Sequence, residues 1–137
     1  MQIQFRQFHP DDTEQTVALW QACGLTRPWN DPHKDIERKL QQEPELFIVA
    51  ERDGLLLGSV MAGYDGHRGW LYAVAVDPGL RGRGIGRALV EHACAALAAR
   101  GCGKVNLQIR DGNEAVAAFY ETLSFEREAR ISLGRVL

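Results

Sequence analysis

The sequence lacks the features that mark several specialised classes of protein. No apolar run approaches the length of a membrane span, and the first residues, Met1 to Arg6, hold no signal-peptide core; we therefore expect a cytoplasmic protein with no membrane partner. Cysteine is scarce: Cys23, Cys94 and Cys102 form no Cys-x-x-Cys pair, which predicts the reduced thiols of a cytosolic protein. The cysteines and histidines show no ligand spacing, so we expect no metal site. A formal net charge of -2 leaves no cationic excess, which argues against a nucleic-acid partner.

The remaining composition is ordinary for a globular protein. The 137 residues are 45% hydrophobic and 25% charged, and they contain no repeat, low-complexity tract or linker. This length supports one sizeable core and is too short for two, so we expect residues 1–137 to form a single domain.

The hydrophobic patterning predicts strands interspersed with helices. The expected elements are a strand at 3–8, a helix at 10–24, a helix opening at 32, strands at 47–50, 55–64 and 71–76, a helix at 85–100, a strand at 105–109, a helix opening after 113, and a strand or hairpin after 125. Asp31 is expected to cap the second helix, Asp53-Gly54 to form a hairpin turn, and Gly101 to end the long helix. The order describes an α/β sandwich.

The stretch from 71 to 100 combines a short strand, a glycine-rich turn and a long apolar-striped helix. Gly82, Gly84 and Gly86 alternate with Arg83, Ile85 and Arg87. The first turn of a helix leaves backbone N–H groups unpaired, and glycines remove the Cβ atoms that would keep a ligand away from them. The arginines add positive charge, so this turn suits a pyrophosphate. A simple packing turn between strand and helix is the alternative.

Two common phosphate loops do not fit this turn. A P-loop needs Lys followed by Ser or Thr after its last glycine, whereas Arg87-Ala88 stands here. A dinucleotide-binding loop needs Gly-x-Gly-x-x-Gly near the first strand, and this turn lies past the middle of the chain with different spacing.

The pattern Arg81-x-x-Gly84-x-Gly86, directly after a strand that ends in Val-Asp-Pro, resembles the coenzyme A loop of the GNAT N-acetyltransferase superfamily. The resemblance extends along nearly the whole chain. It implies a single-domain α/β fold with a mixed central sheet, a splayed central strand and about four flanking helices. It also implies acetyl-CoA as co-substrate. The implied cofactor-binding residues are Val74, Ala75 and Val76, as backbone donors on the central strand, and Arg81, Gly82, Arg83, Gly84, Ile85, Gly86 and Arg87, around the pyrophosphate.

The segment from Asn113 to Phe125 resembles the second motif of the same superfamily. The resemblance gives Asn113 a cofactor contact and gives Tyr120 the role of general acid, which protonates the leaving thiolate. The alternatives are that Asn113 is only a helix cap and that Tyr120 is only a core residue. Ser124 departs from the family, which usually has Gly before Phe; this position shapes the turn after the helix and affects stability more than chemistry.

The base that would take a proton from the acceptor amine is not evident. In the RimI-like branch, which acetylates protein N-termini, a Glu stands where this chain has Gln108, and Gln cannot act as a base. Protein N-terminal acetylation therefore loses support. The candidates that remain are Glu51, Asp65, His67 and Tyr72, with a chain of water molecules as an equal alternative.

The connector at 27–32, which contains Pro28, Trp29 and Pro32, is stiff and carries an aromatic side chain. It is expected either to form a wall of the acceptor site or to be a capped turn with Trp29 in the core. Together with the segment 63–69, it resembles a small bacterial group of GNAT proteins called YpeA-like.

These observations predict an enzyme that transfers an acetyl group from acetyl-CoA to a primary amine, of a small molecule or of a peptide or protein, by direct attack. The rival hypothesis is a non-catalytic acyl-CoA-binding module that regulates a protein partner, and a weaker one is binding of another phosphate ligand such as a nucleotide. The acceptor, the acyl-chain selectivity and homodimer formation, which is common in the superfamily, remain open.

Overall fold

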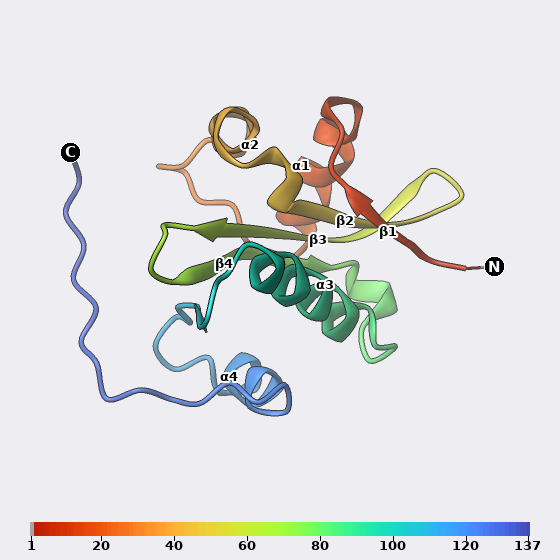
Figure 1. Cartoon of the computed structure of the whole chain (residues 1–137). Coiled ribbons are helices and arrows are strands. Elements are labelled where there is room, and N and C mark those ends of the chain that lie inside the picture. Colours follow the sequence, from red (N-terminus) through yellow and green to blue (C-terminus); the bar gives the residue numbers. More distant parts are fainter. Residues whose placement is uncertain (1) are drawn as a thin grey trace. The chain divides into compact units, whose positions relative to one another are not determined.

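The computed structural model describes residues 2–137 and contains two compact units, with the boundary between Leu107 and Gln108 (Figure 1). In the first unit the elements are β1 (Gln4–Gln7), α1 (Thr13–Ala22), α2 (Pro32–Gln42), β2 (Phe47–Arg52), β3 (Leu55–Tyr64), β4 (Gly69–Val76), α3 (Ile85–Ala99) and β5 (Val105–Asn106). The second unit contains α4 (Glu114–Glu121). No helix within residues 2–137 is both long enough and apolar enough to cross a membrane.

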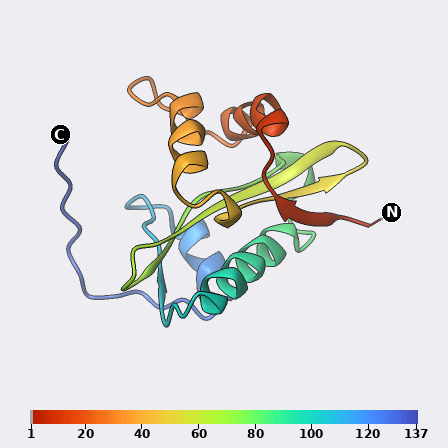
Figure 2. The same cartoon turned by 45° about the horizontal axis from the view of Figure 1, so that its top comes forward.

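The five strands form one mixed sheet in the order β1-β2-β3-β4-β5. The first three pairings are antiparallel and the pairing of β4 with β5 is parallel. Helices α1 and α2 cover one face of the sheet and α3 covers the other (Figures 1 and 2). The predicted fold class, with a mixed sheet and four α-helices among the described residues, is confirmed.

Apolar side chains of the strands and helices bury both faces of the sheet. On the α1 face, Phe8 stacks on Phe47 with ring centroids 4.2 Å apart, beside the buried Trp20. On the other face, Leu89 and Leu97 of α3 are fully buried. Because an apolar stripe must leave water to contribute stability, the sheet is covered on both sides.

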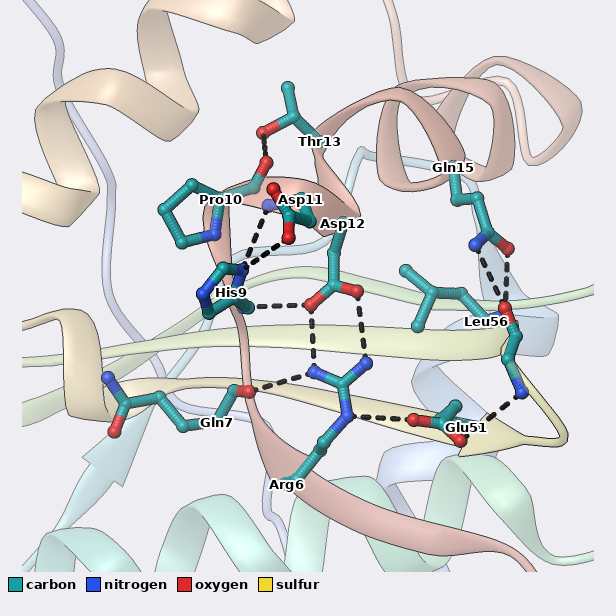
Figure 3. Close-up of polar contacts among 11 residues, drawn as sticks. Arg6, Gln7, His9, Pro10, Asp11, Asp12, Thr13, Gln15, Glu51 and Leu56 are labelled. Carbon is teal, nitrogen blue, oxygen red and sulfur yellow. Dashed lines mark hydrogen bonds and ion pairs between the residues drawn. The ribbon is translucent and has the colours of Figure 1, made fainter.

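A cluster of charged side chains ties the first strand to the elements beside it (Figure 3). Arg6 on β1 donates two hydrogen bonds to the carboxylate of Asp12, at 2.8 and 3.0 Å, and one to Glu51 on β2 at 2.9 Å. Next to this cluster, Gln15 on α1 donates to the carbonyl of Gly54 and accepts from the N–H of Leu56, both at 3.0 Å. These contacts fix the start of α1 against the β2–β3 hairpin.

Most of the expected boundaries and caps are confirmed. Asp31 caps α2 by accepting from the N–H of His33 at 2.9 Å, and Gly101 follows α3 with φ 89°. Asp53 and Gly54 adopt positive φ values of 53° and 81°, which a tight hairpin turn of this hand requires.

Two expectations about the end of the chain need correction. The strand expected at 105–109 covers only Val105–Asn106. The terminal strand or hairpin is wrong, because residues 126–137 form neither helix nor strand. The side chains that suggested it, Ile131, Leu133 and Val136, are 89%, 91% and 98% exposed. Alternating apolar residues stabilise a strand only where the rest of the protein offers a surface against which they are buried.

In the second unit, Asn113 caps α4 by accepting from the N–H of Val116 at 3.4 Å. The chain leaves the helix through a left-handed residue, Ser124, which has φ 71° and lies three residues after the last helical residue, Glu121. The N–H of Phe125 donates to the carbonyl of Tyr120 at 3.1 Å, and that of Ser124 to Glu121 at 3.2 Å. This is the Schellman arrangement, in which glycine is the preferred left-handed residue.

Candidate active site

Strand β4 carries a β-bulge at its centre. The register pairs Ser59 with Ala75 and Met61 with Tyr72, so that two residues, Ala73 and Val74, lie opposite Val60. Ala73 has φ 49°, a left-handed conformation that costs a residue with a side chain about 1 kcal/mol or more. The bulge reorients the backbone at the residues for which a cofactor role is predicted.

Strand β4 separates from its parallel neighbour, β5, after two paired residues. Strand β5 pairs with β4 only at Gly69 and Trp70, so the rest of this β4 edge has no partner strand among residues 2–107. This is the splayed strand of the predicted fold.

The register narrows the predicted set of backbone donors on β4. The N–H of Asp77 donates to Leu57 at 2.8 Å, and hydrogen-bonded pairs alternate along an antiparallel ladder. Ala75, opposite Ser59, therefore directs its backbone groups toward β3. Val74 and Val76 direct theirs toward the open edge.

A buried polar chain holds the bulge. The hydroxyl of Ser59 on β3 donates to the carbonyl of Ala73 at 2.9 Å, and the indole N–H of Trp20 on α1 donates to the Ser59 oxygen at 2.9 Å. Ser59 is fully buried and Trp20 is 4% exposed. Buried hydrogen bonds of this kind are rigid because neither partner can turn to water.

The glycine-rich turn follows β4 directly. Gly82 and Gly84 have φ 79° and 82°, and a Cβ at either position would meet no atom within 4 Å. Gly84 is the N-cap of α3 and has no side chain to cap the helix. Arg81, Arg83 and Arg87 are exposed. Ile85 is buried, so it can offer a ligand only its backbone.

This geometry fits a pyrophosphate. The two left-handed glycines bring bare backbone to the surface at the positive end of a helix, and the three arginines place cationic groups beside it.

A cavity of about 600 Å³ lies on the α1–α2 side of the bulge. Trp20, the connector after α1, and α2 form one side, and Met61, Tyr72 and Ala73 of the sheet form the other. From the connector, Asn30 and Pro32 line the cavity. The alternative of a core Trp29 is wrong, because this side chain is 78% exposed.

Helix α2 and its C-cap residue, Glu43, contribute a charged stripe to the cavity that no sequence pattern predicted. Asp35, Lys39 and Glu43 follow one another at intervals of four residues, and all three line the cavity. Such spacing is typical of a solvated helix face, so no local signal marks these residues as part of a site.

The charges of the stripe are paired. Lys39 donates to the carbonyl of Ala62 and lies 3.7 Å from Glu43. Burial lowers the pKa of Lys39 below its ordinary value, and the neighbouring Glu43 opposes that shift. The carboxylate of Asp35 lies 3.4 Å from the guanidinium of Arg38 and also accepts from the side chain of Asn30 at 2.5 Å.

Of the four candidate bases, only Tyr72 lines the cavity. Burial raises the pKa of Tyr72, which keeps the phenol protonated at neutral pH. Glu51 is bound to Arg6, and this hydrogen bond lowers its pKa. Asp65 accepts from the backbone N–H groups of Arg68 and His67, at 2.7 and 2.8 Å, and its pKa is lowered by them. Glu51 and Asp65 are thus occupied by structural contacts.

The other predicted site residues lie in the second unit. Asn113 is the cap of α4, as its alternative reading expected. Tyr120 is 7% exposed, and its ring packs edge-on against Phe119 and Phe125, with centroids 5.0 and 5.4 Å away. Gln108 donates to the hydroxyl of Ser132.

Comparisons with known proteins identify the family. The family model described as "Acetyltransferase (GNAT) family" matches residues 8–125. An acetyltransferase of Yersinia pestis is 50% identical over 135 residues, which cover 98% of this chain and 96% of that protein. The chain therefore belongs to the GNAT acetyltransferase family. It is an acetyltransferase that uses acetyl-CoA as co-substrate and an amine as acceptor.

Solved structures agree on the fold. AAC(6')-Iy, in complex with the bisubstrate analog CoA-S-monomethyl-acetylneamine, matches with a TM-score of 0.82 and 20% identity, over 100% of this chain and 99% of that one. The NatC complex bound to Gag peptide and CoA matches with a TM-score of 0.79 and 25% identity, over 96% of this chain and 89% of that one.

Proposed function

We propose that this protein acetylates a primary amine bound in the cavity between α1, α2 and β4. Acetyl-CoA lies along the open edge of β4, with its pyrophosphate on the residues from Arg81 to Arg87. The N–H groups of Val74 and Val76 donate to the cofactor, and Asn113 contributes a further contact. Residues 1–137 act as one acetyltransferase domain; the family match at 8–125, which includes parts of both units, supports this assignment.

The bulge on β4 is the observation that carries the proposal. Ala73 lines the cavity, and the next residue, Val74, directs its N–H toward the open edge of the strand. A thioester held at Val74 is therefore one peptide away from an amine in the cavity.

The reaction is a direct transfer. The amine nitrogen attacks the thioester carbonyl carbon, the backbone donors stabilise the oxyanion, and the C–S bond breaks as the amide forms. Tyr120 gives its phenolic proton to the departing thiolate, and the proton released by the nitrogen passes to water. Burial raises the pKa of the Cys94 thiol, which disfavours a covalent cysteine intermediate.

The cavity favours a small polar acceptor or the end of a peptide. Its volume of about 600 Å³ is typical of sites for small molecules. Because carboxylates and cations are both present, in Asp35, Glu43, Arg38 and Lys39, the lining suits an amine that also carries polar groups.

Thiol release from acetyl-CoA, measured with a panel of amines, tests the proposal. We expect turnover with at least one polar primary amine. Tyr120→Phe should lower kcat about 100-fold, as expected for loss of a general acid, with unchanged stabilisation by CoA in thermal unfolding. Tyr64→Phe, which alters a phenol outside the cavity lining, is the matched control and should retain full activity.

Two results would count against the proposed roles. Full activity of Tyr120→Phe would show that Tyr120 is not the general acid. Stabilisation by CoA without turnover for any amine would instead favour the regulatory module.

A further inference from the structure

The polar chain from Trp20 through Ser59 to Ala73 is more elaborate than core packing requires. The indole of Trp20 on α1 donates to the buried hydroxyl of Ser59 on β3, and this hydroxyl in turn donates to the carbonyl of Ala73, the left-handed residue of the bulge. We propose that Ser59, oriented by Trp20, is a positioning residue that aims the N–H of Val74 at the thioester carbonyl. The inference rests on the proposed donor role of Val74.

The geometry of one peptide links Ser59 to Val74. The described residues contain no cis peptide bond, so the peptide between Ala73 and Val74 is trans and planar. In such a peptide the C=O and the N–H point in opposite directions. Because Ser59 holds the Ala73 carbonyl at 2.9 Å, the N–H of Val74 points away from Ser59.

Trp20 decides which way the Ser59 hydroxyl donates. A hydroxyl has one proton and can also accept. The indole N–H can only donate, and it occupies an acceptor position of the Ser59 oxygen at 2.9 Å. The hydroxyl proton is therefore directed to the carbonyl of Ala73 rather than toward the indole.

The left-handed conformation of Ala73 explains why such a hold is needed. At φ 49°, this residue is strained by about 1–2 kcal/mol relative to an ordinary strand conformation. Rotation of the peptide would relieve the strain and turn the N–H of Val74 out of place. One buried hydrogen bond of ordinary strength is comparable in size to this strain.

The carbonyl stretch of bound acetyl-CoA, labelled with ¹³C at the carbonyl carbon and measured by infrared difference spectroscopy without acceptor, reports directly on this N–H. A donor that polarises the thioester lowers the stretching frequency. We expect the carbonyl frequency of acetyl-CoA bound to the unaltered protein to be lower than that of acetyl-CoA free in solution. More than half of this shift should disappear in Ser59→Ala. The kcat of Ser59→Ala should fall about 30-fold, less than for complete loss of an oxyanion donor, while KM for acetyl-CoA changes less than about twofold.

Thr16→Val is the matched control. Thr16 on α1 is also fully buried, and its hydroxyl has no hydrogen-bond partner among the described residues. Removal of this hydroxyl should leave both kcat and the carbonyl frequency unchanged. Trp20→Phe keeps the Ser59 hydroxyl but frees its orientation, so it should give a smaller loss of the frequency shift than Ser59→Ala.

The outcomes separate the inference from the function on which it rests. If the unaltered protein turns over but shows no frequency shift, the donor role of Val74 is wrong. If the shift is present and Ser59→Ala keeps it, the positioning role is wrong. If Ser59→Ala does not fold, Trp20→Phe decides: an unchanged shift overturns the inference, and a reduced shift supports it.

Discussion

Gly58 on β3 is the position where one added methyl group should disturb both stability and the site. A Cβ there would lie 2.7 Å from Cδ1 of Leu89 on α3 and 2.8 Å from the carbonyl oxygen of Ala75 on β4. Leu89 is fully buried and cannot swing into water, and the carbonyl belongs to the backbone of the sheet. Either α3 or β4 must shift.

The cost of Gly58→Ala follows from these two contacts. Overpacking of this kind costs up to about 3 kcal/mol, and the lower chain entropy of alanine in the unfolded state returns about 1 kcal/mol. We expect a net loss of about 2 kcal/mol, which corresponds to a fall in Tm of roughly 6 °C for a chain of this size. Because Ala75 follows Val74, kcat should fall as well.

Thermal unfolding and thiol release measure the two effects of this substitution. Gly103→Ala is the matched control, because a Cβ at Gly103 meets no atom within 4 Å and its φ is not positive. Its Tm should stay within about 2 °C of the unaltered protein, as is usual for surface changes. A Gly58→Ala protein with the same Tm as the control would refute the close packing of α3 on β3.

Three further results are expected. Hydrogen bonding from Arg6 lowers the pKa of Asp12 below its usual 3.8, so the folded state binds this proton less readily than the unfolded state. Asp12→Asn should therefore lower the free energy of unfolding, measured in urea at pH 7, by about 2 kcal/mol. This difference between the two proteins should shrink as the pH falls below about 4. An equal gap at pH 7 and pH 3 would contradict this. Ser124→Gly should raise the free energy of unfolding by about 0.5–1 kcal/mol, because glycine adopts φ 71° without strain; a loss of stability would argue against the left-handed turn. Arg83→Ala should raise KM for acetyl-CoA about fivefold at low salt and less at high salt, since an exposed cation is screened; a salt-independent effect would exclude a charge contact.

Local rules account for what the sequence predicted well. The Asp31 cap and the Asp53-Gly54 turn depend on the conformations of a few consecutive residues. The glycine-rich turn could be interpreted as a phosphate loop for the same reason: its glycines, its arginines and the helix start are adjacent in the chain.

The failures have an equally physical cause. The apolar residues at 131, 133 and 136 resemble a strand, but a strand requires a partner and a face, and neither follows from spacing. Glu51 and Asp65 are candidate bases by residue type alone, but Glu51 accepts from Arg6 and Asp65 accepts from the backbone N–H of Arg68.

The sequence by itself determined the family and the order of elements as far as α4, and it predicts the glycine-rich turn as a cofactor loop, because these depend on short-range patterns. Only the tertiary structure decided the bulge on β4, the buried link from Trp20 to Ser59 and Ala73, and the cavity with its α2 stripe. Trp20 and Ser59 are 39 residues apart in the chain, and no pattern within either segment indicates that they meet. Packing of α1 on the sheet brings them together, and burial then makes a single hydroxyl able to orient the backbone of the site.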